Sequence, residues 1–123
     1  MLVIVSDLHF RDGTAGEHNA STRAFEGFLE ALAAAAKAAC AREVTILFLG
    51  DIFDLLRTEL WFDVPEPKRP WGLSVGAADA LERHASRILD AILEHPVNRE
   101  TFALLGGSLK ERFPLFPTEP ERL

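Results

Sequence analysis

Two continuous apolar runs, separated by a stretch with helical periodicity, set the pattern at the start of the chain. Residues 2–5 and 44–49 are rich in β-branched and large aliphatic side chains without polar alternation, which is typical of buried parallel strands. Between them apolar residues recur at helical spacing up to about Ala41, and Ser21 or Thr22 can cap this helix. The pattern predicts a parallel strand–helix–strand unit.

Helical periodicity returns in the second half of the chain. Residues 76–94 carry apolar side chains such as Leu81 and Ile88 on one face, and Pro96 is expected to end this helix. Asn98 can cap a further helix after it. The fold class predicted from these patterns is α/β, with additional helices after the strand–helix–strand unit.

Other segments show no helix or strand periodicity. Residues 52–56 predict a short helical turn, whereas residues 57–75 hold three prolines and two tryptophans and fit no regular element. Residues 114–123 contain three prolines and are expected to form an irregular tail. We therefore expect residues 1–123 to be a single α/β domain whose sheet is incomplete, because parallel strands need neighbours on both edges and cover on both faces.

Composition excludes several classes of protein. The chain has 123 residues, 48% hydrophobic and 26% charged, with a formal net charge of −6 that argues against nucleic acid or an anionic membrane as a partner. It has neither a basic signal-peptide region nor an apolar run of about 18 residues, so a cytoplasmic location without a membrane partner is predicted. Cys40, the single cysteine, is expected to be buried in a helix.

Ionisable residues follow both predicted strands directly. Asp7 and His9 come after the first strand, and Asp51 and Asp54 come after the second. The carboxyl ends of parallel strands meet at one sheet edge, where these side chains converge and repel one another unless a cation lies between them. The pattern predicts a metal site with Asp7, His9 and Asp51 as ligands and Asp54 beside it. The alternative is that they only cap helices and form turns.

The polar residues that follow the two predicted strands resemble the motifs of a known family. Asp-x-His followed by Gly-Asp-x-x-Asp resembles the first motifs of the calcineurin-like metallophosphoesterases. The stretch Asp12-Gly13-Thr14-Ala15-Gly16 and the later Arg69-Pro70-Trp71 are similar to a bacterial branch of that family. The resemblance implies the N-terminal part of a metallophosphoesterase α/β sandwich, and a metal-dependent phosphoric ester hydrolase acting on a phosphate-ester substrate.

The resemblance also implies roles for the residues at the tips. Asp7 and His9 would hold a first metal ion, and Asp51 would bridge it to a second. Asp54 would take part in catalysis by orienting the histidine of a later Gly-Asn-His-Asp/Glu motif. Members of the family use pairs of divalent ions such as Mn, Fe or Zn, which clamp a phosphate and activate a bridging water.

The later motifs of that family are missing from the chain. No Gly-Asn-His-Asp/Glu or Gly-His-x-His follows Asp54. This predicts a truncated protein, or half of a split protein, that is inactive or weakly active as an isolated chain. The alternative is an interaction module that completes its fold with a complementary chain or by self-association, or a non-functional remnant.

Four further residues are candidates for substrate binding. His18 and Asn19 lie in the loop above the predicted site, and Arg57 and Arg69 belong to the proline- and tryptophan-containing segment. Cationic and polar side chains there would recognise an anionic substrate. The alternative is an exposed loop histidine and a surface loop whose tryptophans cover the edge of the sheet.

Overall fold

The two apolar runs form adjacent parallel strands. The structure is a computed structural model that describes residues 1–16, 19–71 and 78–108. The strands pair in register from Leu2 opposite Thr45 to Ser6 opposite Leu49, which confirms a mixed α/β fold. The described helices and strands, in chain order, are β1 (Leu2–Ser6), α1 (Thr22–Ala38), β2 (Thr45–Leu49), the 3₁₀ helices η1 (Glu59–Asp63) and η2 (Glu66–Lys68), α2 (Ala78–Glu94), α3 (Pro96–Ala103) and the π-helical turn η3 (Leu104–Ser108).

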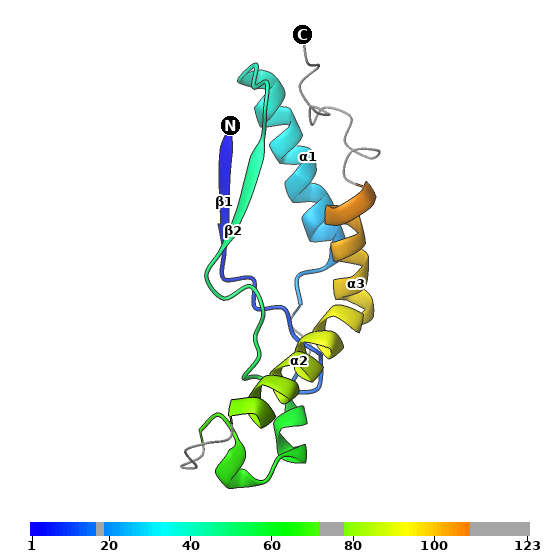
Figure 1. The fold of residues 1–123 in the computed structure, drawn as a ribbon. Coiled ribbons are helices and arrows are strands. Elements are labelled where there is room, and N and C mark those ends of the chain that lie inside the picture. The colour runs from blue at the N-terminus through cyan, green and yellow to red at the C-terminus, as the bar shows by residue number, and fades with distance from the viewer. Residues whose placement is uncertain (17–18, 72–77, 109–123) are drawn as a thin grey trace.

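Helix α1 covers one face of this sheet (Figure 1). Its buried side chains, Phe25, Leu29, Leu32, Ala33 and Ala36, recur every three or four residues, as expected for an amphipathic helix. The hydroxyl of Ser21 accepts a hydrogen bond from the backbone of Ala24 at 3.2 Å, so the predicted cap is present. The helix ends at Ala38, and Cys40 follows in the left-handed region (φ 50°).

The predicted burial of Cys40 was therefore wrong. The residue lies past the end of α1 and its side chain is exposed. The alanine-rich run that suggested a longer helix stops being helical three residues earlier than expected, and the left-handed backbone turns the chain toward β2. Its position is therefore set by the turn rather than by the apolar face of the helix.

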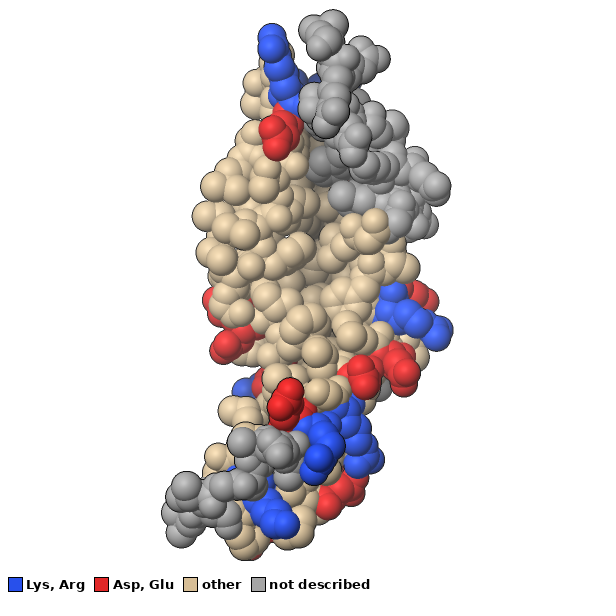
Figure 2. Space-filling model, viewed as in Figure 1, with Lys and Arg blue, Asp and Glu red and all other residues tan. Residues whose placement is uncertain are grey.

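The opposite face of the sheet is open to solvent. Alternate residues are exposed along both strands, with Leu2 at 62% and Ile4 at 58% in β1, and Leu47 at 42% and Leu49 at 44% in β2. The expectation of strands buried on both sides was wrong for these two. In the view of Figure 2 the surface over the strands is mostly uncharged, and most of the charged side chains gather around α2, η1 and η2.

The proline- and tryptophan-containing segment is more regular than predicted, because it holds η1 and η2. Trp61 of η1 is 2% exposed, its ring stacks on that of His84 in α2 at 5.7 Å, and its Nε1 donates to the carbonyl of Leu55 at 2.7 Å. The tryptophan thus anchors the segment to α2.

The helical turn expected for residues 52–56 is absent, and Phe53 instead forms a parallel bridge with Phe10. The predicted tail, residues 114–123, lies outside the described residues.

The prediction that Asn98 caps a helix was wrong. Pro96 is the first residue of α3, so Asn98 lies inside that helix, where it is fully buried. Its Nδ2 donates to the carbonyl oxygens of Arg11 and Ile92, both at 2.8 Å. This side chain therefore joins α3 and the end of α2 to the loop that follows β1.

Replacing Asn98 tests this connection. Asn98→Leu keeps a similar shape but removes the donor to the Ile92 carbonyl, whereas the Arg11 carbonyl keeps its bond from Asn19. Because a buried polar group left unpaired costs about 1–3 kcal/mol, we expect the free energy of unfolding to fall by roughly this amount in urea denaturation. Arg99→Gln, at the exposed neighbouring position of α3, should change it by less than about 0.5 kcal/mol. Equal stability of the two variants would show that the buried hydrogen bonds contribute nothing.

Candidate metal centre

Backbone pairing between the two chain segments continues past the ends of the strands. The hydrogen bonds run from Asp7 N to Leu49 O (3.3 Å), from His9 N to Asp51 O (2.9 Å), from Phe10 N to Ile52 O (2.8 Å) and from Asp54 N to Phe10 O (2.9 Å). The loops after β1 and β2 are thereby held side by side over several residues. Their relative position is set by main-chain atoms, independently of any attraction between the polar side chains.

Asp7, His9 and Asp51 converge at this edge. Each offers one ligand atom, and the three atoms lie within 4.8 Å of one another. Asp7 and Asp51 are exposed, and His9 is partly exposed. Asp7 and His9 both adopt left-handed backbone conformations, with φ of 56° and 50°. Such conformations cost about 1–3 kcal/mol and cluster at functional sites.

Gly50 allows the Asp7 carboxylate to reach this position. Its φ is +69°, and a Cβ built on it would lie 2.6 Å from Asp7 Oδ1. The same oxygen accepts a hydrogen bond from the backbone of Asp51 at 3.4 Å. The glycine is thus required both for its left-handed backbone and for the space that the neighbouring carboxylate occupies.

Asp54 lies on the inner side of the site. One of its carboxylate oxygens, Oδ2, is 3.7 Å from His9 Nδ1, 3.4 Å from Arg11 Nε and 3.6 Å from Arg57 Nε. The other, Oδ1, accepts a hydrogen bond from the backbone of Arg57 at 3.1 Å. The sequence had left Asp54 without a histidine partner, and the structure places His9 beside it. The Arg11 contact is an ion pair without hydrogen-bond alignment.

Arg11 is the residue of this site that the sequence did not single out. It is 8% exposed, and charged side chains are seldom so buried unless they are paired. Its backbone is held by Asn19, whose Oδ1 accepts from Arg11 N at 2.7 Å and whose Nδ2 donates to Arg11 O at 3.1 Å. Its position could have identified it from the sequence, because it lies two residues after His9 and close to the predicted carboxylates.

The remaining candidates have other contacts. Arg69 Nε donates to the carbonyl of Val64 at 2.9 Å, and its guanidinium lies over the Phe62 ring at 5.1 Å. Asn19 holds the backbone of Arg11, as described above, and His18 lies outside the described residues. A role of His18, Asn19, Arg57 or Arg69 in binding a substrate stays a prediction.

Asp12 belongs to a hydrogen-bond network between two segments of the chain. Its carboxylate accepts hydrogen bonds from the hydroxyls of Thr14, at 2.9 Å, and Thr58. The Thr14 hydroxyl in turn accepts from the backbone of Glu59 at 2.9 Å. This network joins the loop after β1 to the start of η1, and it occupies the Asp12 carboxylate with protein donors.

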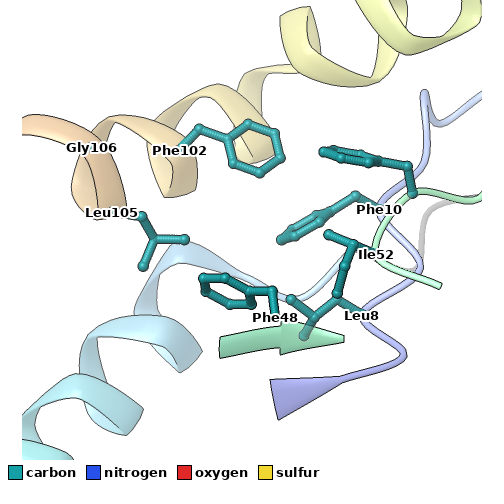
Figure 3. A pocket seen from close by; sticks show the side chains of 8 residues that line it. Leu8, Phe10, Phe48, Ile52, Phe102, Leu105 and Gly106 are labelled. Atoms are coloured by element: carbon teal, nitrogen blue, oxygen red, sulfur yellow. The ribbon is translucent and has the colours of Figure 1, made fainter. Parts of the chain in front are cut away.

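An apolar pocket of about 470 Å³ lies beneath the two loops (Figure 3). Leu8, between two of the converging residues, and Ile52, next to the third, both contribute to it. None of its lining side chains has a polar atom. The lining residues are Leu8, Phe10, Phe48, Ile52, Phe53, Phe102, Leu105 and Gly106.

Comparison with known proteins gives one partial similarity. No protein-family model and no solved structure matches the chain. A phosphatidylglycerol–prolipoprotein diacylglyceryl transferase from Nitrobacter hamburgensis is 36% identical over 66 residues, which is 52% of this chain. The match covers 23% of the relative's own length, so the chain spans about a quarter of that protein.

This finding contradicts the family assignment made from the sequence motifs. The named relative is a transferase, so the predictions of a metallophosphoesterase and of a phosphoric ester hydrolase or phosphatase were wrong. The alternative of an interaction module, split-protein half or remnant is not supported either. The motifs are only three to five residues long, and a residue such as Gly50 also serves the local turn, so chance and backbone geometry can produce them.

The fold prediction is confirmed only as a mixed α/β arrangement, and nothing supports a metallophosphoesterase sandwich. In the part of the chain that the structure describes, none of the helices has the length and apolarity needed to cross a bilayer. The cytoplasmic location stays a prediction.

A pair of glycine variants tests the geometry of the site. Gly50→Ala puts a Cβ on a left-handed residue, against the Asp7 carboxylate, and should lower the free energy of unfolding by about 1–3 kcal/mol. Gly27→Ala makes the same change inside α1, where a Cβ meets nothing within 4 Å. It should raise stability by roughly 0.5–1 kcal/mol, because alanine is the better helix former. Thermal or urea denaturation of both variants measures the difference, and an unchanged stability in Gly50→Ala would contradict the described geometry.

Proposed function

We propose that this chain binds a divalent cation through Asp7, His9 and Asp51. The observation that carries the proposal is the convergence of two carboxylates and one imidazole, with ligand atoms within 4.8 Å of one another. Two negative charges at this separation repel each other, and a cation between them removes the repulsion. The exposed carboxylates of Asp7 and Asp51 can rotate to shorten the ligand separations as they close on an ion.

The donor set indicates which ions to test. Carboxylate oxygens suit Mg²⁺ and Mn²⁺, and an imidazole nitrogen suits Zn²⁺ and Fe²⁺. A mixed set of two oxygens and one nitrogen therefore favours Mn²⁺, Fe²⁺ or Zn²⁺ over Ca²⁺, which takes six to eight oxygens. Three protein ligands leave coordination positions to water, as in exchangeable metal sites rather than closed structural ones.

The backbone also supports such a site. Main-chain hydrogen bonds hold the two loops together, and Asp7 and His9 adopt left-handed conformations at the ends of the strands. Little of the binding free energy is then needed to order the loops, although the ligand side chains must still close on the ion.

Calorimetric titration with MnCl₂ and with ZnCl₂ tests the proposal. We expect one equivalent of metal to bind the wild-type chain. Asp51→Asn should raise the dissociation constant by more than about tenfold, because loss of even an outer partner of a ligand costs 10–100-fold. The matched control is Asp63→Asn, which makes the same charge change on η1, where Asp63 pairs with Arg87 at 3.0 Å.

Two outcomes would contradict the proposed site. One is a wild-type chain that takes up neither ion. The other is a dissociation constant that Asp51→Asn and Asp63→Asn change by the same factor, which would show that only the overall charge matters.

Bound metal should also stabilise the fold. A ligand that binds only the folded state at 100 times its dissociation constant adds about 2.7 kcal/mol to the free energy of unfolding. We expect a gain of this size for the wild type in urea denaturation with saturating ZnCl₂, and a smaller gain for Asp51→Asn at the same concentration. An equal gain in both proteins would place the metal elsewhere, because the ligand set of the proposed site is incomplete in the variant.

A further inference from the structure

The histidine of the candidate metal centre has carboxylates of two kinds near it. The carboxylates of Asp7 and Asp51 each have an oxygen within 4.8 Å of a His9 ring nitrogen. Asp54 has its Oδ2 3.7 Å from His9 Nδ1. Among the described residues the group with ligand spacing is Asp7, His9 and Asp51, and Asp54 is not part of it.

Asp54 is held more firmly than the other carboxylates. Its side chain is only 12% exposed, and Arg11 and Arg57 flank its Oδ2 at 3.4 and 3.6 Å. The backbone of Arg57 donates to its Oδ1, and its own backbone donates to the carbonyl of Phe10. Asp54 is therefore fixed at both its main chain and its side chain, whereas Asp7 and Asp51 are exposed.

We infer that Asp54 is a positioning residue for the metal ligand His9, an inference that rests on the proposed cation site. Asp54 Oδ2 lies 3.7 Å from Nδ1, beyond hydrogen-bond distance, and its negative charge there favours the imidazole form that carries its proton on Nδ1, which leaves the lone pair of Nε2 for the metal. A carboxylate that accepts from the second ring nitrogen is the usual outer partner of a metal-bound histidine, because it fixes the ring orientation and makes the ligand nitrogen more basic.

The buried Arg11 contacts Asp54 from the inner side of the site. Arg11 is 8% exposed, and its backbone is clamped by Asn19 and Asn98. It therefore approaches Asp54 from the protein interior, while His9 is 40% exposed at the side chain. In the inferred arrangement Arg11 holds Asp54 from the interior, Asp54 orients the His9 ring, and Nε2 is left for the cation.

Zn²⁺ binding by three variants of the full chain tests the inference. Asp54→Asn keeps the acceptor for the Arg57 backbone but weakens the acceptor beside Nδ1, and should raise the Zn²⁺ dissociation constant about 10- to 100-fold. Arg83→Gln, which removes one positive charge from an exposed position of α2, should change the constant less than about twofold. Asp63→Asn, which removes one carboxylate from η1, should match the wild type.

Nitrogen-15 NMR of the histidine rings supplies a readout that a merely structural role would not move. In the metal-free wild type we expect His9 to carry its proton on Nδ1, and Zn²⁺ should shift the Nε2 resonance. In Asp54→Asn the preference for this form should weaken while amide spectra show a folded chain. The wild-type measurement decides the matter even if the variant fails to fold.

Several results would overturn the positioning role. They are coordination of Zn²⁺ through Nδ1, a metal-free His9 with its proton on Nε2, or a folded Asp54→Asn chain that binds Zn²⁺ as tightly as Asp63→Asn. A wild-type chain that binds no Zn²⁺ would instead refute the proposed cation site, and the metal-free spectrum would still report whether Asp54 orients the ring.

Discussion

The main-chain hydrogen bonds that continue the pairing of β1 and β2 beyond the strands are the constraint on which the candidate site depends. They place Asp7 and His9 beside Asp51 through atoms that every residue has. Side chains of like charge would otherwise move the two loops apart. The left-handed residues at the tips then turn the side chains toward one another.

Behind this exposed edge lies a layer of buried polar groups. Asn98 of α3 and Asn19 of the loop both bond to the main chain of Arg11, and the Arg11 side chain reaches Asp54. A helix 87 residues further along the chain is thereby connected to the loop after β1. Buried polar groups of this kind are costly when unpaired, so the pairing rigidifies the inner side of the site.

The two faces of the sheet have different surroundings. One face packs on α1, and the other exposes aliphatic side chains such as Ile4 and Leu47. The polar side chains of the candidate site lie at the carboxyl edge between these faces. The pocket next to this edge, in contrast, is lined by apolar side chains alone (Figure 3).

Short polar motifs proved a poor guide to family. Asp-x-His and Gly-Asp-x-x-Asp each need only two or three specified residues, and several of those also satisfy the backbone. Gly50 is needed for its positive φ, and Asp54 accepts a hydrogen bond from a backbone amide three residues later, as many turn residues do. The residue pattern can therefore arise without the enzyme that it resembles.

The two strands, the first helix and the parallel pairing of the strands could be predicted from the amino-acid sequence. The apolar runs, the Ser21 cap and the helical spacing in α1 each depend on near neighbours, and parallel pairing follows from a single helical connection. The same reasoning placed Asp7, His9 and Asp51 at one edge, because residues at strand ends inherit their position from the sheet.

The contacts between polar groups far apart in the sequence depend on the packing of the elements and could not be predicted from the sequence. That Asn98 binds Arg11 rather than capping a helix, and that Asp54 faces His9, depends on how α3 and the loops pack to within a few ångströms. The exposure of one face of the strands likewise depends on tertiary structure, because α1 covers only the other face. Hydrophobic periodicity reports the average environment of a segment, whereas a hydrogen bond requires a specific partner at a specific distance.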